Sequence, residues 1–123
     1  MANPYEYRHE DGIYYTVMNP SLIVGGQPQS AADVEMLARE EGVTHVINLQ
    51  QDKDIKYWGI DYSEISDAAA RERVAIVRRP AVDFDPNSLR SMLPTAVASI
   101  DAAVSSGGRA YVHCTAGINR ANL

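Results

Sequence analysis

The stretch Ala110–Arg120, with the sequence AYVHCTAGINR, joins a short apolar segment to a reactive side chain and a loop. The apolar run Ala110–His113 predicts a β-strand. Cys114, which is the one cysteine of the chain, follows this strand at once, and the loop after it ends at Arg120. A candidate nucleophile therefore lies at the carboxyl end of a strand, where open α/β sheets bind their ligands.

Predicted strands and helices alternate upstream of this stretch. Short apolar runs predict strands at Tyr14–Met18, Leu22–Val24, Val43–Leu49 and Val74–Arg78. Helical patterns predict helices from Ser30 to Glu41, over Ser63–Arg73 and over Ser88–Ser105. Strands separated by helices indicate an α/β fold with a central, largely parallel sheet flanked by helices.

Two connections and one proline complete the predicted outline. Residues 50–61, QQDKDIKYWGID, are polar around an aromatic pair and predict a loop. Residues 80–86 predict a second loop, which carries Asp83, Phe84 and Asp85. Pro94 lies inside the last predicted helix, where it predicts a kink or a short helix that runs into a longer one.

The composition is that of an ordinary globular domain. The chain has 123 residues, of which 46% are hydrophobic and 22% charged, and this length corresponds to one domain. No apolar run approaches the roughly 18–20 residues that span a bilayer, so we expect no membrane partner. The net charge of −5 lacks the basic footprint of a general nucleic-acid binder. The amino-terminal residues, MANPYEYRHEDG, have neither a signal-peptide core nor the composition of a transit peptide.

The loop after Cys114 is suited to binding an anion. Its residues are Thr115, Ala116, Gly117, Ile118, Asn119 and Arg120. A short glycine-containing turn can point successive backbone N–H groups inward, which favours the thiolate and holds phosphate oxygens. An arginine at its end can clamp two of those oxygens with its planar fork. The alternative is a buried cysteine and a surface arginine at this spacing by chance. The preceding strand and His113 favour a phosphate site.

Phosphoryl transfer through cysteine needs a general acid for the leaving oxygen. Asp83 is the preferred candidate, while Asp85 stands before Pro86 and fits simple turn chemistry. The choice between the two aspartates stays open at the level of the residues. His113 precedes the nucleophile, so its side chain should point to the opposite face of the strand. We therefore expect His113 to support the loop rather than to act as a base.

The string VHCTAGINRA resembles the signature loop of the dual-specificity phosphatases, within the cysteine-dependent protein tyrosine phosphatase superfamily. Further segments resemble the plant glucan phosphatases, of the short Like-Starch-Excess-Four type: NPYEY, LIVGGQPQ, VINLQQDKDIKYWGID, RRPAVDFDP and SLRSMLP. The resemblance covers the chain from Asn3 to Ala121. It implies a phosphatase that acts on phosphorylated glucan such as starch, amylopectin or malto-oligosaccharides.

The resemblance also implies roles for particular residues. Cys114 would be the nucleophile, Arg120 the phosphate clamp and Asp83 the general acid. Aromatic residues would contact the glucan: Tyr57, Trp58 and Phe84 in a channel, with Tyr5 and Tyr7 in an amino-terminal recognition region. That region would comprise residues 1–20 approximately, and the catalytic core residues 21–123. Without the resemblance, the Tyr57-Trp58 pair could equally be a hydrophobic plug beneath a loop.

The implied mechanism requires no metal and no other cofactor, because loop amides and a guanidinium supply the positive charge. We expect a monomer, and the resemblance implies a location in the chloroplast. The family domain continues with several helices after the signature loop, whereas three residues follow Arg120 here. We therefore expect a partial domain. Two rival functions remain: a phosphoprotein phosphatase, which the signature loop alone would allow, and a non-catalytic glucan-binding or scaffold protein.

Overall fold

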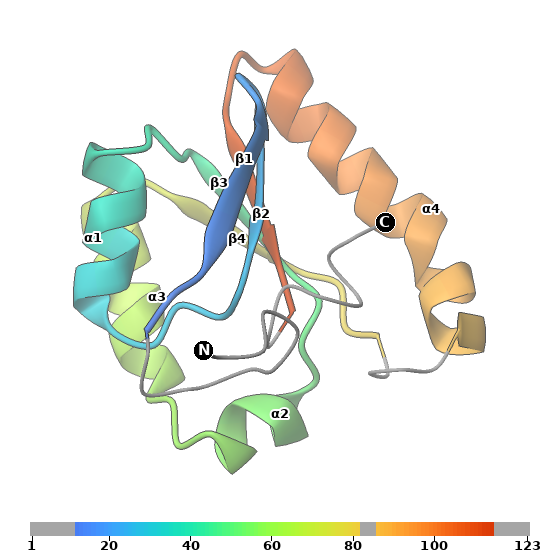
Figure 1. Ribbon diagram of the computed structural model, residues 1–123, viewed down its shortest axis with the longest axis horizontal. Coiled ribbons are helices and arrows are strands. Elements are labelled where there is room, and N and C mark those ends of the chain that lie inside the picture. Colours follow the sequence, from blue (N-terminus) through green and yellow to red (C-terminus); the bar gives the residue numbers. More distant parts are fainter. Residues whose placement is uncertain (1–11, 82–85, 115–123) are drawn as a thin grey trace, which may run out of the picture.

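The computed structural model describes residues 12–81 and 86–114, which form a mixed sheet with helices on both faces (Figure 1). The strands are β1 (Tyr15–Asn19), β2 (Leu22–Gly25), β3 (His45–Asn48), β4 (Ala75–Arg78) and β5 (Ala110–His113). The helices are α1 (Ala31–Arg39), α2 (Asp52–Tyr57), α3 (Tyr62–Arg71) and α4 (Pro86–Ser105). The predicted α/β fold is confirmed. None of the helices in the described residues is long and apolar enough to cross a membrane.

The sheet has the order β1-β2-β5-β3-β4, which places the last strand of the chain in the middle. β1 pairs with β2 in antiparallel orientation, and the pairings of β2 with β5, β5 with β3 and β3 with β4 are parallel. His113 is in register with Gly25 on one side and with Asn48 on the other, and Asn48 is in register with Arg78. The four parallel strands therefore end level with one another.

Each face of the sheet has its own core. α1 and α3 cover one face, where Ile23, Val46 and Tyr111 belong to a buried cluster with helix residues such as Leu37. α4 covers the other face, where Ile47, Leu49, Val112, Ala96 and Cys114 form the second cluster (Figure 1). Successive residues of β3 and β5 alternate between the two clusters, as the period-two geometry of a strand requires.

The helix boundaries are close to those predicted, but the local contacts differ. α1 begins directly after Ser30, yet the Ser30 side chain makes no capping bond. The carboxylate of Asp33 instead accepts the N–H of Gln29 at 2.8 Å. The helix ends before Gly42, whose φ of +68° is a conformation that glycine adopts without strain.

The prediction of a loop over residues 50–61 is wrong, because this segment contains the helix α2. The Asp54 carboxylate accepts the N–H of Gln51 at 2.9 Å, which satisfies a backbone donor at the helix start. Ile55 is 7% exposed and attaches the helix to the protein. A six-residue helix with one buried side chain has too little apolar periodicity to be recognised from sequence. α4 continues through Pro94, so the proline does not divide it into two helices.

Replacing Tyr111 by phenylalanine should destabilise the fold. The Tyr111 side chain is fully buried, and its hydroxyl donates a hydrogen bond to the Gly26 carbonyl at 2.6 Å. Loss of that donor leaves the carbonyl without this bond, and we expect the free energy of unfolding to fall by about 1–2 kcal/mol in urea titrations. The control is Tyr15→Phe, whose hydroxyl is exposed to solvent with the rest of its side chain and lies 3.8 Å from the Met36 sulfur. Equal losses in the two variants would contradict this account.

Stability should also depend on pH through an ion pair between α1 and α3. Arg39 donates two hydrogen bonds to the Glu72 carboxylate, Nε to Oε1 at 2.7 Å and Nη2 to Oε2 at 2.9 Å. The hydrogen bond from Arg39 holds the pKa of Glu72 below its ordinary value of 4.5. Because the fold favours the ionised form of Glu72, the ion pair stabilises the protein at pH values above this ordinary pKa. The contribution is lost as the pH falls through the lowered pKa.

Urea midpoints of the unaltered chain and Glu72→Gln should therefore differ at neutral pH and converge in acid. Asp101→Asn removes an exposed carboxylate on α4 and serves as the control. A difference between Glu72→Gln and the unaltered chain that does not change with pH would refute the assignment.

Candidate active site

Buried polar side chains gather at the carboxyl ends of the parallel strands. Among the described residues they are Gln27, Asn48, Gln50 and His113, each about 1% exposed or less. Gln27 follows β2, Asn48 and Gln50 lie at the end of β3, and His113 ends β5. Burying a polar group is costly unless it is hydrogen-bonded. Their concentration at one edge marks this edge as the place where the fold maintains a polar site.

Cys114 lies in the middle of this edge. It is 2% exposed and packs in the cluster with Ile47, Leu49 and Val112 on the α4 side of the sheet. The ring of His113 lies against that of Tyr111, with centroids 5.8 Å apart, and so belongs to the opposite face. His113 Nδ1 is 2.9 Å from the carbonyl oxygen of Cys114. His113 thus contacts the backbone where the predicted phosphate loop begins.

A pair of buried amides connects the segments on either side of β5. Gln50 Nε2 donates to Gln27 Oε1 at 2.7 Å, and the two residues follow the strands that flank β5. The backbone N–H of Gln50 donates to Asn48 Oδ1 at 2.7 Å. Strand pairing continues past β3, because the Leu49 N–H donates to the His113 carbonyl at 2.8 Å. Hydrogen bonds to neighbouring segments therefore fix the backbone as far as the residue before Cys114.

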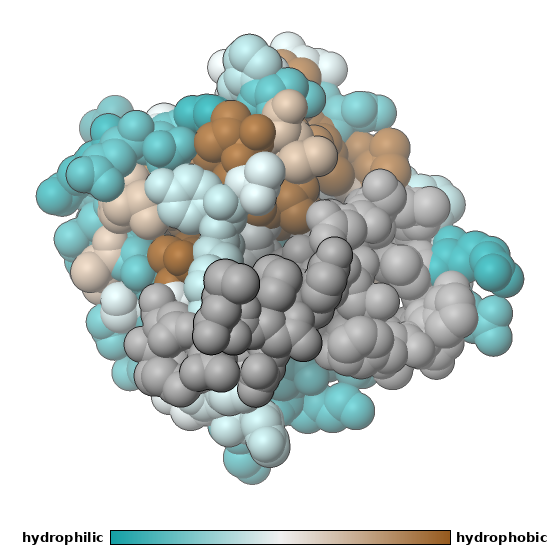
Figure 2. Space-filling view, in the orientation of Figure 1, coloured by the Kyte–Doolittle hydropathy of each residue, from teal (hydrophilic) through white to brown (hydrophobic). Residues whose placement is uncertain are grey.

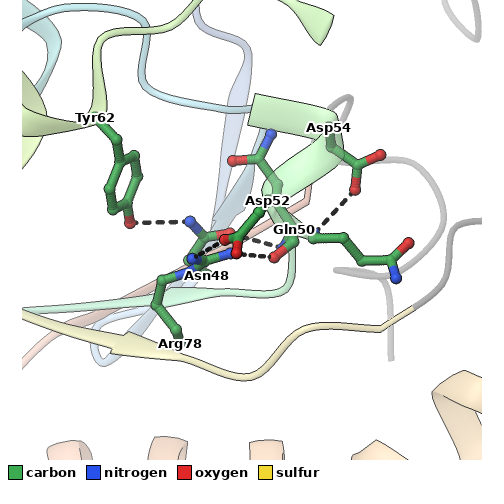
Figure 3. A network of polar contacts seen from close by, with 7 residues as sticks. Asn48, Gln50, Asp52, Asp54, Tyr62 and Arg78 are labelled. Atoms are coloured by element: carbon green, nitrogen blue, oxygen red, sulfur yellow. Dashed lines mark hydrogen bonds and ion pairs between the residues drawn. The ribbon is translucent and has the colours of Figure 1, made fainter. Parts of the chain in front are cut away.

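Arg78 connects these hydrogen-bonded segments to the helices α2 and α3 (Figure 3). Its Nη1 donates to the Asp52 carboxylate and its Nη2 to the Gln50 carbonyl, both at 2.6 Å. The guanidinium also lies over the Tyr62 ring, 5.5 Å from its centroid. The Tyr62 hydroxyl accepts a hydrogen bond from Asn48 Nδ2 at 2.9 Å. Arg78 therefore joins the end of β4 to the starts of α2 and α3.

The aromatic pair lies at the far end of α2, which follows β3 and lies beyond the carboxyl ends of the strands (Figure 1). The Tyr57 and Trp58 rings meet edge to face with centroids 5.1 Å apart. Tyr57 is 79% exposed, whereas Trp58 is partly buried. Tyr57 is therefore not a hydrophobic plug, and it offers an aromatic face to solvent.

The structure describes four of the predicted site residues: Cys114, His113, Tyr57 and Trp58. The others lie outside the described residues: Tyr5, Tyr7, Asp83, Phe84, Asp85, Thr115, Ala116, Gly117, Ile118, Asn119 and Arg120. Ala81, the last described residue before Asp83, donates its N–H to the Leu49 carbonyl at 3.0 Å. Within the ranges 12–81 and 86–114, no cluster of His, Cys, Asp and Glu side chains is suited to hold a metal ion.

Sequence reasoning missed the buried polar residues Gln27, Asn48 and Gln50, and the half-buried Arg78 beside them. A signal was present, because Asn48 interrupts the apolar residues near the end of the predicted strand Val43–Leu49 and Gln50 directly follows that strand. Their meaning depends on which strands become neighbours, and the order of the strands is not readable from local pattern.

Comparisons with known proteins agree with this geometry. Residues 22–123 match the family model described as "Dual specificity phosphatase, catalytic domain". The chain is 42% identical over 117 residues to "Phosphoglucan phosphatase DSP4, amyloplastic" of Castanea sativa. It is 33% identical over 116 residues to "Phosphoglucan phosphatase LSF1, chloroplastic" of Arabidopsis thaliana. Both alignments cover 94% of this chain, which spans 31% and 20% of the length of these relatives.

Solved phosphatase structures share the fold. A crystal structure of Tk-PTP aligns with a TM-score of 0.66 at 21% identity, covering 84% of this chain and 61% of that one. A Cydia pomonella PTP-2 phosphatase aligns with a TM-score of 0.65 at 16% identity, covering 87% of this chain and 63% of that one. Because the family model matches most of its length, this chain belongs to the family of dual-specificity phosphatase catalytic domains.

Proposed function

We propose that this protein removes phosphate from phosphorylated glucan through a phosphocysteine intermediate on Cys114. The observation that carries the proposal is the place of Cys114, directly after the central parallel strand of a dual-specificity phosphatase domain. The glucan substrate is supported by the two relatives, both of which bear the name phosphoglucan phosphatase. Their names also support a location in a plastid.

The first step forms the sulfur–phosphorus bond. The Cys114 thiolate attacks phosphorus in line, and the bond from phosphorus to the glucosyl oxygen breaks. Asp83 donates its proton to the leaving oxygen, so the glucan departs with a free hydroxyl group. The amides of residues 115–120 and the Arg120 guanidinium hold the equatorial oxygens, on which negative charge is concentrated.

The second step regenerates the enzyme. A water molecule attacks phosphorus, Asp83 accepts its proton as a base, and the sulfur–phosphorus bond breaks. Inorganic phosphate leaves and Cys114 is again a thiolate. Amides and guanidinium supply the positive charge in both steps, so neither step needs a metal ion or another cofactor.

Hydrogen bonds among the described residues at the carboxyl edge support these roles. The Leu49 N–H donates to the His113 carbonyl and the Ala81 N–H donates to the Leu49 carbonyl, so these two bonds connect the ends of three neighbouring strands. Ala81, two residues before Asp83 in the sequence, is thereby held at the same edge as Cys114. The contact of His113 with the Cys114 carbonyl supports its role in holding the start of the loop.

Glucan contacts are assigned to the aromatic side chains. Aromatic rings pack on the apolar faces of glucose units while polar groups bind their hydroxyls. The exposed Tyr57 and the adjoining Trp58 support this assignment for one part of the channel. Phe84, beside the general acid, would hold the glucan chain near the reacting phosphate. Tyr5 and Tyr7 would contribute from the recognition region at residues 1–20.

Phosphate release from phosphorylated amylopectin tests the chemistry. Cys114→Ser should reduce the rate by more than about a thousandfold, because the nucleophile is lost. Asp83→Ala should reduce the rate by about 10²–10⁴-fold, since the leaving oxygen is no longer protonated. Asp85→Ala is the matched control and should retain most of the activity. Full activity of Cys114→Ser would exclude the mechanism, and a larger loss for Asp85→Ala would make Asp85 the acid.

A second prediction concerns the substrate class. Trp58→Ala should lower kcat/KM for phosphorylated amylopectin by about tenfold, because a ring that binds the glucan is lost. The rate with a phosphotyrosine peptide should not change. A protein that prefers the peptide, with or without Trp58, would be a phosphoprotein phosphatase. If the protein binds glucan but shows no phosphate release that depends on Cys114, it is a binding or scaffold protein.

A further inference from the structure

The helix that carries the aromatic pair is poorly anchored by its own residues. α2 has six residues, far fewer than the roughly 12–15 that an isolated helix needs for marginal stability in water. Ile55 is its buried side chain. The orientation of so short a helix must therefore depend on contacts at its ends, and Tyr57 and Trp58 stand at one of those ends.

Arg78 contacts the other end of the helix from outside it, in addition to the local bond from the Gln51 N–H to Asp54. One arm of its guanidinium bonds the Gln50 carbonyl, just before the helix, and the other bonds the Asp52 carboxylate on the first helical residue. Figure 3 shows both bonds converging on the guanidinium from the start of α2. The planar fork of arginine fixes direction as well as distance, which a lysine ammonium cannot do.

Arg78 is itself held by the sheet and by α3. It ends β4 in register with Asn48, and the next residue, Arg79, donates its N–H to the Asn48 carbonyl at 2.8 Å. The Tyr62 ring lies beneath the guanidinium, and its hydroxyl is bonded by Asn48. Arg78 is therefore fixed by β3 and Tyr62 on one side and contacts the start of α2 on the other.

The two bonds to α2 differ in importance. Asp52 has a side chain that is 89% exposed, and an ion pair at such a site contributes little. Gln50 is buried, so its carbonyl depends on protein donors rather than on water. The bond from Arg78 to the Gln50 carbonyl should therefore set the position of the helix, and the Asp52 bond should add little.

We propose that Arg78 is a positioning residue that sets where the Tyr57–Trp58 pair stands relative to Cys114, and so determines the affinity for glucan. The inference rests on the proposed glucan function. With about 1.5 Å of rise per residue, a small tilt at Asp52 is carried along the helix to Tyr57. Misplacement of a substrate-positioning group by about 1 Å can cost up to a hundredfold in rate.

The first test needs no substrate. Trp58 is the one tryptophan in the sequence, so fluorescence excited at wavelengths that tyrosine does not absorb reports on this site alone. In the ligand-free chain, Arg78→Lys should raise acrylamide quenching of Trp58 by about twofold and lower its anisotropy, since the fork that orients α2 is lost. Arg39→Lys is the control, because Arg39 makes a similar forked contact to Glu72 between α1 and α3. Unchanged quenching in Arg78→Lys would overturn the proposal.

A milder variant guards against loss of folding in Arg78→Lys. Tyr62→Phe keeps the ring beneath the guanidinium and removes the hydroxyl that Asn48 bonds. It should change quenching in the same direction by a smaller amount. If Arg78→Lys does not fold and Tyr62→Phe quenches like the unaltered chain, the proposal is overturned.

Kinetics then separate positioning from catalysis. Arg78→Lys should lower kcat/KM for phosphorylated amylopectin by about tenfold, mainly through KM, and leave hydrolysis of p-nitrophenyl phosphate within about twofold. Asp52→Asn should lose less than about threefold with amylopectin. Equal losses on both substrates would assign Arg78 a general structural or catalytic role. If the unaltered chain releases no phosphate from amylopectin, the proposed function fails, and the quenching result still decides the positioning of Trp58.

Discussion

The pairing of β5 with β2 on one side and with β3 on the other is the constraint on which the site depends. Both pairings are parallel, and both end at His113, opposite Gly25 and Asn48. The next residue, Cys114, must therefore leave the sheet at the centre of its carboxyl edge. Helices cover both faces of the sheet, so this edge is the side on which the central strand can meet a ligand.

The buried amides around Cys114 follow from the same constraint. The residues after β2 and β3 converge over the end of β5, where Gln27 and Gln50 bond each other. A buried polar network whose members are bonded holds one arrangement, because every alternative leaves a costly unpaired group. The edge is therefore stiff at the place where the proposed mechanism brings the Cys114 thiolate to phosphorus. Arg78 extends this stiffness to α2, which stands outside the core.

Sequence pattern predicted the strands and the long helices because each of them has a local signal. Ala110–His113 was predicted with the bounds that the structure has, since it is a compact apolar run between glycines and Cys114. α2 was missed because polar contacts from Arg78, remote in sequence, hold it rather than apolar periodicity. The polar edge was likewise hidden, since Gln27 and Gln50 become neighbours only through the strand order. Tyr57 and Trp58 were assigned to the glucan channel through the resemblance to the glucan phosphatases, and their contact with glucan stays a prediction.

The most direct test of the account is to identify the residue that carries phosphate during turnover. Asp83→Ala should be mixed with glucan labelled with radioactive phosphate, quenched in acid and digested, and the labelled peptide sequenced. The account predicts label on the peptide that contains Cys114, and none when Cys114 is also replaced by serine. Label on a different residue would contradict the account. So would phosphate release by the unaltered chain if neither that chain nor Asp83→Ala carried any label.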